Sequence, residues 1–140
     1  MAFDWLNRIL GRDNHHEARQ VLRPLWTAVV AAARQKDWYL AGQVPDTIDG
    51  RFDVLALVAA QTLLRLEDFG EDGLLAMARF AELFAQDMDG QLRQEGHGDV
   101  GVGNRVEELV GALGGRLGAL RGVFEGKEVM AAMLIRNLYR

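Results

Sequence analysis

The chain has 140 residues, a net charge of −4 and 49% hydrophobic residues. This length favours a single domain over residues 1–140, with a core large enough to need no disulfide or metal. The chain has no cysteine, which excludes thiolate catalysis, and its acidic balance argues against a DNA-binding protein.

The N-terminal segment does not have the pattern of a signal peptide. Asp4 and Arg8 interrupt its apolar run, and no small-residue cleavage site follows. No apolar run elsewhere reaches the ~18 residues of a membrane span. The sequence therefore predicts a protein that stays in the cytoplasm.

The first predicted helix covers about residues 2–10 and is amphipathic. Segment 1–12 either docks its apolar side onto the rest of the molecule, or lies in a membrane interface or on a partner. A second helical pattern runs from Asp13 or Asn14 to about residue 36. Pro24 lies inside it, which implies either a kink or two helices with Pro24 in the first turn of the second.

A polar loop over 37–50 follows, in which Asp46 or Thr47 can cap the next helix. That helix is apolar on all sides, which is typical of a central position in a bundle. The remaining elements are a helix over 50–67, a helix over 72–93, a glycine-rich loop over 95–103, a helix over 104–124 and a last helix over 126–139. The predicted fold class is all-α, a single compact bundle of five to seven helices.

The helix over 104–124 combines an apolar seam with a glycine face. The seam consists of Val106, Val110, Leu113, Leu117, Leu120 and Phe124. The face, on another side of the helix, consists of Gly111, Gly114, Gly115, Gly118 and Gly122. Glycines at this spacing let another backbone approach closely. Either a neighbouring helix of the same chain or a helix of a partner could pack there.

Two polar segments, 44–53 and 84–102, carry more charge and glycine than a helix boundary needs. Neither contains a catalytic set. A calcium loop would need glycine at the position of Leu92, and the glycines near Asp99 follow no strand, so neither a metal nor a nucleotide site is predicted. Asp89 and Arg93 are four residues apart and should pair on the helix surface.

Both segments resemble the ubiquinol–cytochrome c chaperone family, a family of helical proteins from alphaproteobacteria and mitochondria. The pair Gly115-Arg116 and the run 136–139 also resemble the family pattern. The resemblance extends from about Val21 to residue 140. Gln94 and Asn104 depart from it, because a glutamate and a basic residue are expected there.

The resemblance implies an assembly chaperone for the cytochrome bc1 complex that binds newly made cytochrome b, with no enzymatic activity and no cofactor. It also implies a small partner subunit or the ribosome as further partners, and a membrane client would fit peripheral association with the inner face of the cytoplasmic membrane. The alternative is a small helical adaptor or regulator that binds a soluble protein.

Eight charged residues are the predicted partner-binding set, and the competing interpretation of each is that it only holds the fold together. They are Arg51, Asp53, Asp87, Asp89, Arg93, Asp99, Arg105 and Arg116.

Overall fold

The computed structural model describes residues 15–140, where the chain forms six α-helices and one short 3₁₀ helix. The α-helices are α2 (His15–Val21), α3 (Arg23–Ala33), α4 (Ile48–Glu67), α5 (Glu71–Gln94), α6 (Asp99–Phe124) and α7 (Met130–Asn137), and the 3₁₀ helix is η1 (Lys36–Trp38). The all-α prediction is confirmed. The docking predicted for segment 1–12 lies outside the described residues.

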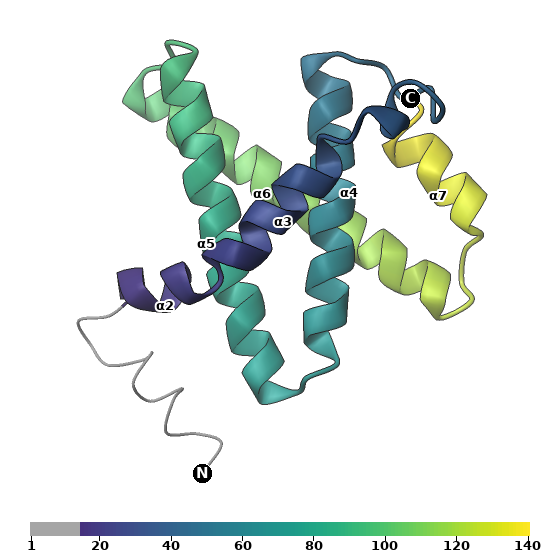
Figure 1. The fold of residues 1–140 in the computed structure, drawn as a ribbon, viewed down its shortest axis with the longest axis horizontal. Helices are drawn as coiled ribbons and strands as arrows, with labels where there is room; N and C mark the ends of the chain where they lie inside the picture. The colour runs from purple at the N-terminus through teal and green to yellow at the C-terminus, as the bar shows by residue number, and fades with distance from the viewer. Residues whose placement is uncertain (1–14) are drawn as a thin grey trace.

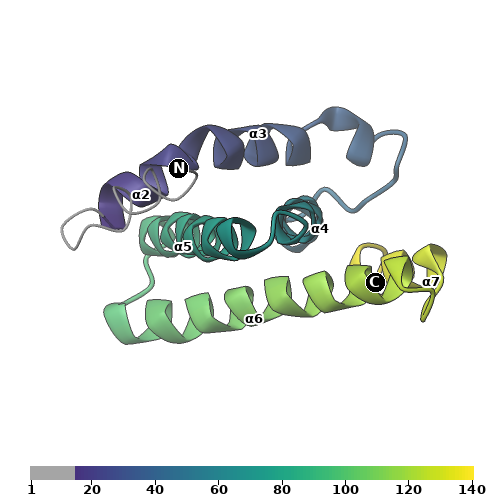
Figure 2. The ribbon, with the colours of Figure 1, turned by 90° about the horizontal axis from the view of Figure 1, so that it is seen from below.

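The helices form three layers (Figures 1 and 2). The antiparallel pair α4 and α5 makes the middle layer, α2 and α3 cover one of its faces, and α6 and α7 cover the other. Helix α4 packs against α3, α5 and α6. The predicted central position of this helix is confirmed, because a helix with apolar side chains all round needs cover on all sides.

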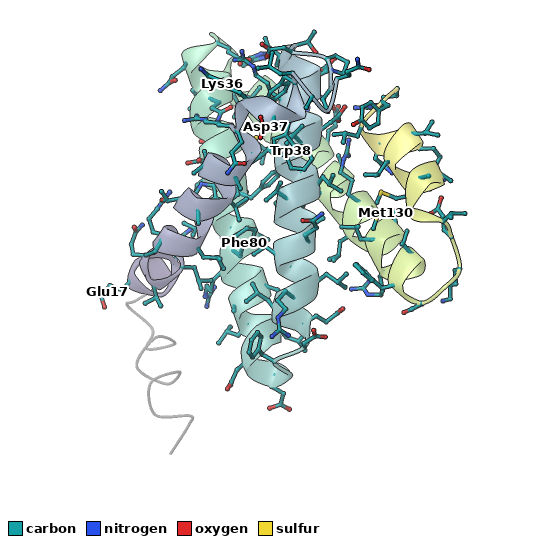
Figure 3. The ribbon with its side chains drawn as sticks, turned by 45° about the vertical axis from the view of Figure 1, so that its right-hand side comes forward. Glu17, Lys36, Asp37, Trp38, Phe80 and Met130 are labelled. Carbon is teal, nitrogen blue, oxygen red and sulfur yellow. The ribbon has the colours of Figure 1, made fainter. Side chains whose placement is uncertain are left out.

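Aromatic side chains fill the centre of the bundle. Trp26 of α3 meets Phe80 and Phe84 of α5 edge to face, with ring centroids 5.5 and 5.9 Å apart. Figure 3 labels Phe80 at this position. Edge-to-face pairs add about 0.5–1.5 kcal/mol beyond the area they bury, so this cluster is a main tie between the first two layers.

Pro24 separates two helices. Helix α2 ends at Val21, α3 begins at Arg23, and Pro24 lies in the first turn of α3. Proline is well tolerated there because the first N–H groups of a helix have no partner within it. Of the two predicted alternatives, the break between helices is the one that the structure shows.

Two predicted boundaries after α5 are wrong. Helix α6 begins at Asp99, so Gly101 and Gly103 belong to a helix and not to a loop. The buried Val102 holds this first turn against the core, and such packing outweighs the low helix propensity of glycine. Helix α7 begins at Met130, because Gly126 has a φ of 77° and ends the preceding turn.

The seam predicted on α6 is partly wrong. Its buried residues are Val102, Leu109, Leu113, Arg116 and Leu120. Phe124, the predicted end of the seam, is 70% exposed. The pattern was assigned from apolar residues alone, so it left out Arg116, and the buried side of the helix is rotated toward that arginine.

The glycine face of α6 touches nothing within residues 15–140. A Cβ built on Gly111, Gly114, Gly115, Gly118 or Gly122 has no atom within 4 Å other than its own helix backbone and chain neighbours. Packing of a helix of the same chain onto this face, the first of the two predicted alternatives, is therefore wrong for the described residues. Packing of a partner helix stays a prediction.

The double variant Gly111→Ala, Gly118→Ala is expected to raise the free energy of unfolding by about 0.8–1 kcal/mol per site, because alanine restricts the unfolded chain and meets no obstacle here. Urea unfolding followed by circular dichroism measures it. The contrasting variant is Gly73→Ala in α5, whose Cβ would lie 1.9 Å from the Leu66 carbonyl oxygen and which should be destabilised. A loss of stability in the double variant would contradict the open face.

Candidate functional site

The first polar segment, 44–53, forms the turn that starts α4. Thr47 is the cap, and its Oγ1 accepts a hydrogen bond from the Gly50 N–H at 3.0 Å. Val44 is buried and anchors the turn to the core. A Cβ on Gly50 would lie 1.9 Å from the Pro45 carbonyl oxygen, so the close approach of the two backbones requires glycine. The segment is a rigid start for the helix.

Arg51 leaves this turn toward solvent. Its Nε donates to Asp46 Oδ1 at 2.7 Å, so Asp46, the other candidate cap, is in an exposed ion pair. This hydrogen bond raises the pKa of Arg51. An exposed pair of this kind contributes little to stability, which leaves Arg51 available for a partner.

The second polar segment, 84–102, joins the end of α5 to the start of α6. Arg93 Nε lies 3.1 Å from Asp89 Oδ2, which confirms the predicted pairing, and Arg93 Nη1 also donates to Asp99. These bonds, first to Asp99 and then to Asp89, raise the pKa of Arg93. We call these three residues the Arg93 bridge, because they connect the two helices across a sharp turn at Gly96, where φ is 91°.

Asp53 and Arg116 form a buried ion pair between α4 and α6. Arg116 Nη2 donates to Asp53 Oδ1 at 2.5 Å, and Arg140 donates to the same oxygen at 2.8 Å. Asp53 is 3% exposed and Arg116 is 6% exposed. Burial lowers the pKa of Arg116, and the charge of Asp53 opposes this effect. The guanidinium also lies 5.6 Å from the ring centroid of Phe52.

This Asp53 cluster (Asp53, Arg116 and Arg140) holds α4, α6 and the segment after α7 together. As folded, Asp53 and Arg116 offer almost no surface to another molecule. Their partner-binding role stays a prediction, and their geometry favours the competing interpretation, that they hold the fold together.

The last two predicted residues lie on different helices. Asp87 Oδ2 accepts a hydrogen bond from Trp26 Nε1 at 2.7 Å, and Asp87 Oδ1 lies 3.8 Å from Arg23, so it fastens α5 to α3. Arg105 Nη1 of α6 lies 2.7 Å from Glu108 on the same helix. Together with Arg51, these two residues line one cavity.

That cavity, which we call the four-helix groove, has a volume of about 970 Å³. It lies where α3 ends, α4 begins, α5 ends and α6 begins, toward the upper end of the bundle in Figure 1. Its apolar lining consists of Val30, Ala33, Phe52, Leu55, Met88, Leu92 and Leu109. The groove is a concave surface with an apolar floor and charged edges, the general form of a binding site.

The two polar segments meet through aromatic rings. Phe52 and Phe84 have ring centroids 6.3 Å apart. Within residues 15–140, no ion pair connects one segment to the other, and their charges pair within a segment or with residues outside both. Aromatic packing, and not charge pairing, therefore brings the two segments into contact.

Among the groove residues that sequence reasoning did not single out are Arg34, Lys36 and Ile48. Arg34 and Lys36 follow the last turn of α3, where cations are common because they interact well with the helix dipole. Ile48 is the first residue of α4 and belongs to no apolar stripe. Local spacing carries no signal for any of them.

The described part of the chain has neither a cluster of metal ligands nor a helix able to span a membrane. Between residues 15 and 140, no three histidine or acidic side chains are grouped so that they could hold a metal ion. In the same residues, no helix combines the length and the hydropathy needed to cross a membrane.

Known proteins share the sequence pattern and the fold of this chain. Residues 40–140 match the family described as "Ubiquinol-cytochrome C chaperone", a range that includes both polar segments. The fold is also similar to the crystal structure of the Cbp3 homolog from Brucella abortus, with a TM-score of 0.70 and 38% sequence identity. That alignment covers 98% of this chain and 74% of the other. No curated protein matches.

Proposed function

The chain belongs to the ubiquinol–cytochrome c chaperone family, and from this membership we propose that it assists assembly of the cytochrome bc1 complex by binding newly made cytochrome b. The observation that carries the proposal is the family match over residues 40–140. The likeness to the Cbp3 homolog at 38% identity supports it, since that alignment covers nearly the whole chain.

The geometry of the groove fits holding a client. Its floor is apolar and open to the outside, and binding of an apolar client surface there would remove both surfaces from water. The arginines of the predicted set are engaged with carboxylates rather than directed at one reacting centre. This arrangement suits reversible capture of a folding intermediate.

The test of the proposed function is a crosslinking pull-down of the tagged protein from its native host, with mass spectrometry of the bound proteins. Cytochrome b as the leading hit, together with loss of the bc1 complex in a deletion strain, is the expected result. Soluble partners alone, with an intact bc1 complex in the deletion strain, would favour the adaptor. The same experiment tests the proposed small partner subunit, ribosome binding and membrane association.

Arg93→Ala is expected to reduce the recovery of cytochrome b in this pull-down while the helical content stays unchanged. The Arg93 bridge is exposed, and an exposed ion pair contributes little to stability because water screens its charges. The matched control is Arg65→Ala. Arg65 lies in the last turn of α4 and forms an exposed ion pair with Asp68, which follows the helix. If the Arg93 variant unfolds, the role of Arg93 is to hold the fold together.

The open glycine face of α6 allows a second readout in the same pull-down. The variant Gly111→Ala, Gly118→Ala adds two methyl groups to a surface that meets no side chain of residues 15–140. If a client helix packs there, recovery falls although stability rises. Unchanged recovery would remove the glycine face from the client-binding surface.

A further inference from the structure

The floor of the four-helix groove is made of side chains that the fold covers only in part. Val30, Phe52 and Leu55 pack against the core, yet each remains half-buried because the groove is open above them. Ile48 stands at the edge of the groove and is 77% exposed. A large apolar side chain beside an open apolar floor is a feature of interaction sites.

Two of the four carboxylates that line the groove have an arginine nearby. Asp46 pairs with Arg51 at 2.7 Å, and Asp87 lies 3.8 Å from Arg23.

The other two carboxylates of the lining are Asp49, in the first turn of α4, and Glu95, just after α5. Asp49 acts on Arg140 and helps to raise its pKa, and Glu95 lies 3.8 Å from His97, which carries a charge when it is protonated. Asp46 and Asp87 are thus compensated by an arginine of the same chain.

Two cations of the lining have no such compensation. Arg105 pairs with Glu108, but Arg34 and Lys36 lie within 4 Å of no carboxylate in residues 15–140. Both are exposed, one immediately after α3 and the other in η1, where Figure 3 labels Lys36. Two cations without an ion-pair partner in residues 15–140 therefore lie on the groove lining at the end of α3.

We propose that the four-helix groove binds an amphipathic helix of the client, whose apolar side fills the floor and whose acidic residues face Arg34 and Lys36. This inference rests on the proposed function, because the client supplies the helix. A volume of about 970 Å³ is at the upper end of the ~300–1,000 Å³ found for binding pockets. It accommodates the side chains along one face of a helix, as in other helix-in-groove complexes, while the helix backbone stays at the surface.

The charges also set the direction of the bound helix. Uncompensated cations lie at the α3 end of the groove, while the α5 end carries Glu95. A helix with acidic residues at one end would gain attraction in only one of its two orientations. Complementary charge of this kind mainly provides specificity, and the apolar floor provides most of the affinity.

The test measures binding of three labelled synthetic peptides to the purified full chain by fluorescence anisotropy. Each peptide has about 18 residues, or five helical turns. The first has leucines at helical spacing with glutamates beside them, the second replaces the glutamates with lysines, and the third scrambles the first. We expect the glutamate peptide to bind roughly tenfold more tightly than the lysine peptide, and the scrambled peptide to bind weakly.

Variants then locate the binding on the protein. The double variant Arg34→Glu, Lys36→Glu is expected to prefer the lysine peptide over the glutamate peptide, and Ile48→Asp to weaken binding of both. All three positions are exposed, so circular dichroism should show an unchanged fold. The matched control is Leu74→Asp, which changes an apolar residue of α5 that is 57% exposed and lies outside the groove lining. It should bind as the wild type does.

Equal binding of the glutamate and lysine peptides, a double variant that keeps the glutamate preference, or equal binding of the scrambled peptide would each overturn the inference. A strain carrying only the double variant separates it from the proposed function. Full bc1 assembly in that strain would overturn the groove site and leave the chaperone role standing. An intact bc1 complex in the strain that lacks the protein would overturn the chaperone role itself.

Discussion

Asp53→Ala is expected to lower the free energy of unfolding by about 3–5 kcal/mol, because it leaves the Arg116 guanidinium buried without its carboxylate. Arg116 would keep two hydrogen bonds to backbone carbonyl groups, those of Ala112 and Asn137, and these do not neutralise its charge. Arg140 would lose the same partner. Equilibrium unfolding in urea gives the difference.

The control for this measurement is Asp89→Ala, which removes a carboxylate from the exposed Arg93 bridge and should cost about 0–1 kcal/mol. The double variant Asp53→Ala, Arg116→Met should recover part of the loss, since no buried charge then remains. A loss below about 1 kcal/mol for Asp53→Ala would mean that water reaches Arg116 and that the pair is not buried in solution.

Phe84→Ala is expected to have the second large effect, a decrease of about 3–5 kcal/mol in the free energy of unfolding. Phe84 is fully buried, contacts Trp26 and packs against Phe52 of the other polar segment. Its removal opens a cavity between the first two layers, beside the rings of Trp26 and Phe52. Urea unfolding followed by circular dichroism would measure the free energy of unfolding.

The matched control is Phe69→Ala, the same substitution at a residue that is 59% exposed. Phe69 has one notable contact, the Arg65 guanidinium at 5.0 Å from its ring centroid, so its loss should cost about 0.5–1 kcal/mol. Similar costs for the two variants would show that the aromatic cluster does not hold the layers together.

Both large effects concern residues of the two segments that resemble the family. Within them, Gly50 permits a close backbone approach, Thr47 caps a helix, Asp53 is in a buried ion pair and Phe84 fills the core. Much of the resemblance therefore reports how this fold is built. Client contact has to be sought among exposed residues of the same region, which is why the groove and the Arg93 bridge are the surfaces to test.

The fold class could be predicted from the sequence because apolar residues recur at helical spacing in every segment. The ends of the helices were harder to predict, since they depend on contacts between distant parts of the chain. Gly96, Gly98 and the following glycines indicate a loop when taken alone. In the fold, the buried Val102 and the contact between Arg93 and Asp99 make the same residues the first turn of α6.

The candidate site also combines features that local spacing predicts with features that it does not. Asp89 and Arg93 are one helical turn apart, so their pairing follows from spacing. Asp53 and Arg116 are 63 positions apart, and nothing local connects them. Arg34 and Lys36 look like ordinary residues at a helix end until the structure shows that they border a groove and have no carboxylate partner in the described part of the chain. Features that depend on three or four helices together could not be read from any one of them.

The order of the layers is also the order in which a ribosome would make them. Helices α2 and α3 emerge first, the α4–α5 pair follows, and α6 comes last with α7. Domains generally fold as units during synthesis, from the N-terminal side onward. Here the outer face of the α4–α5 pair, including the buried carboxylate of Asp53, has no cover until the chain has passed Arg116. A nascent chain halted before that point would itself present an apolar surface and an unpaired charge, so this chaperone would be a client for other chaperones while it is being made.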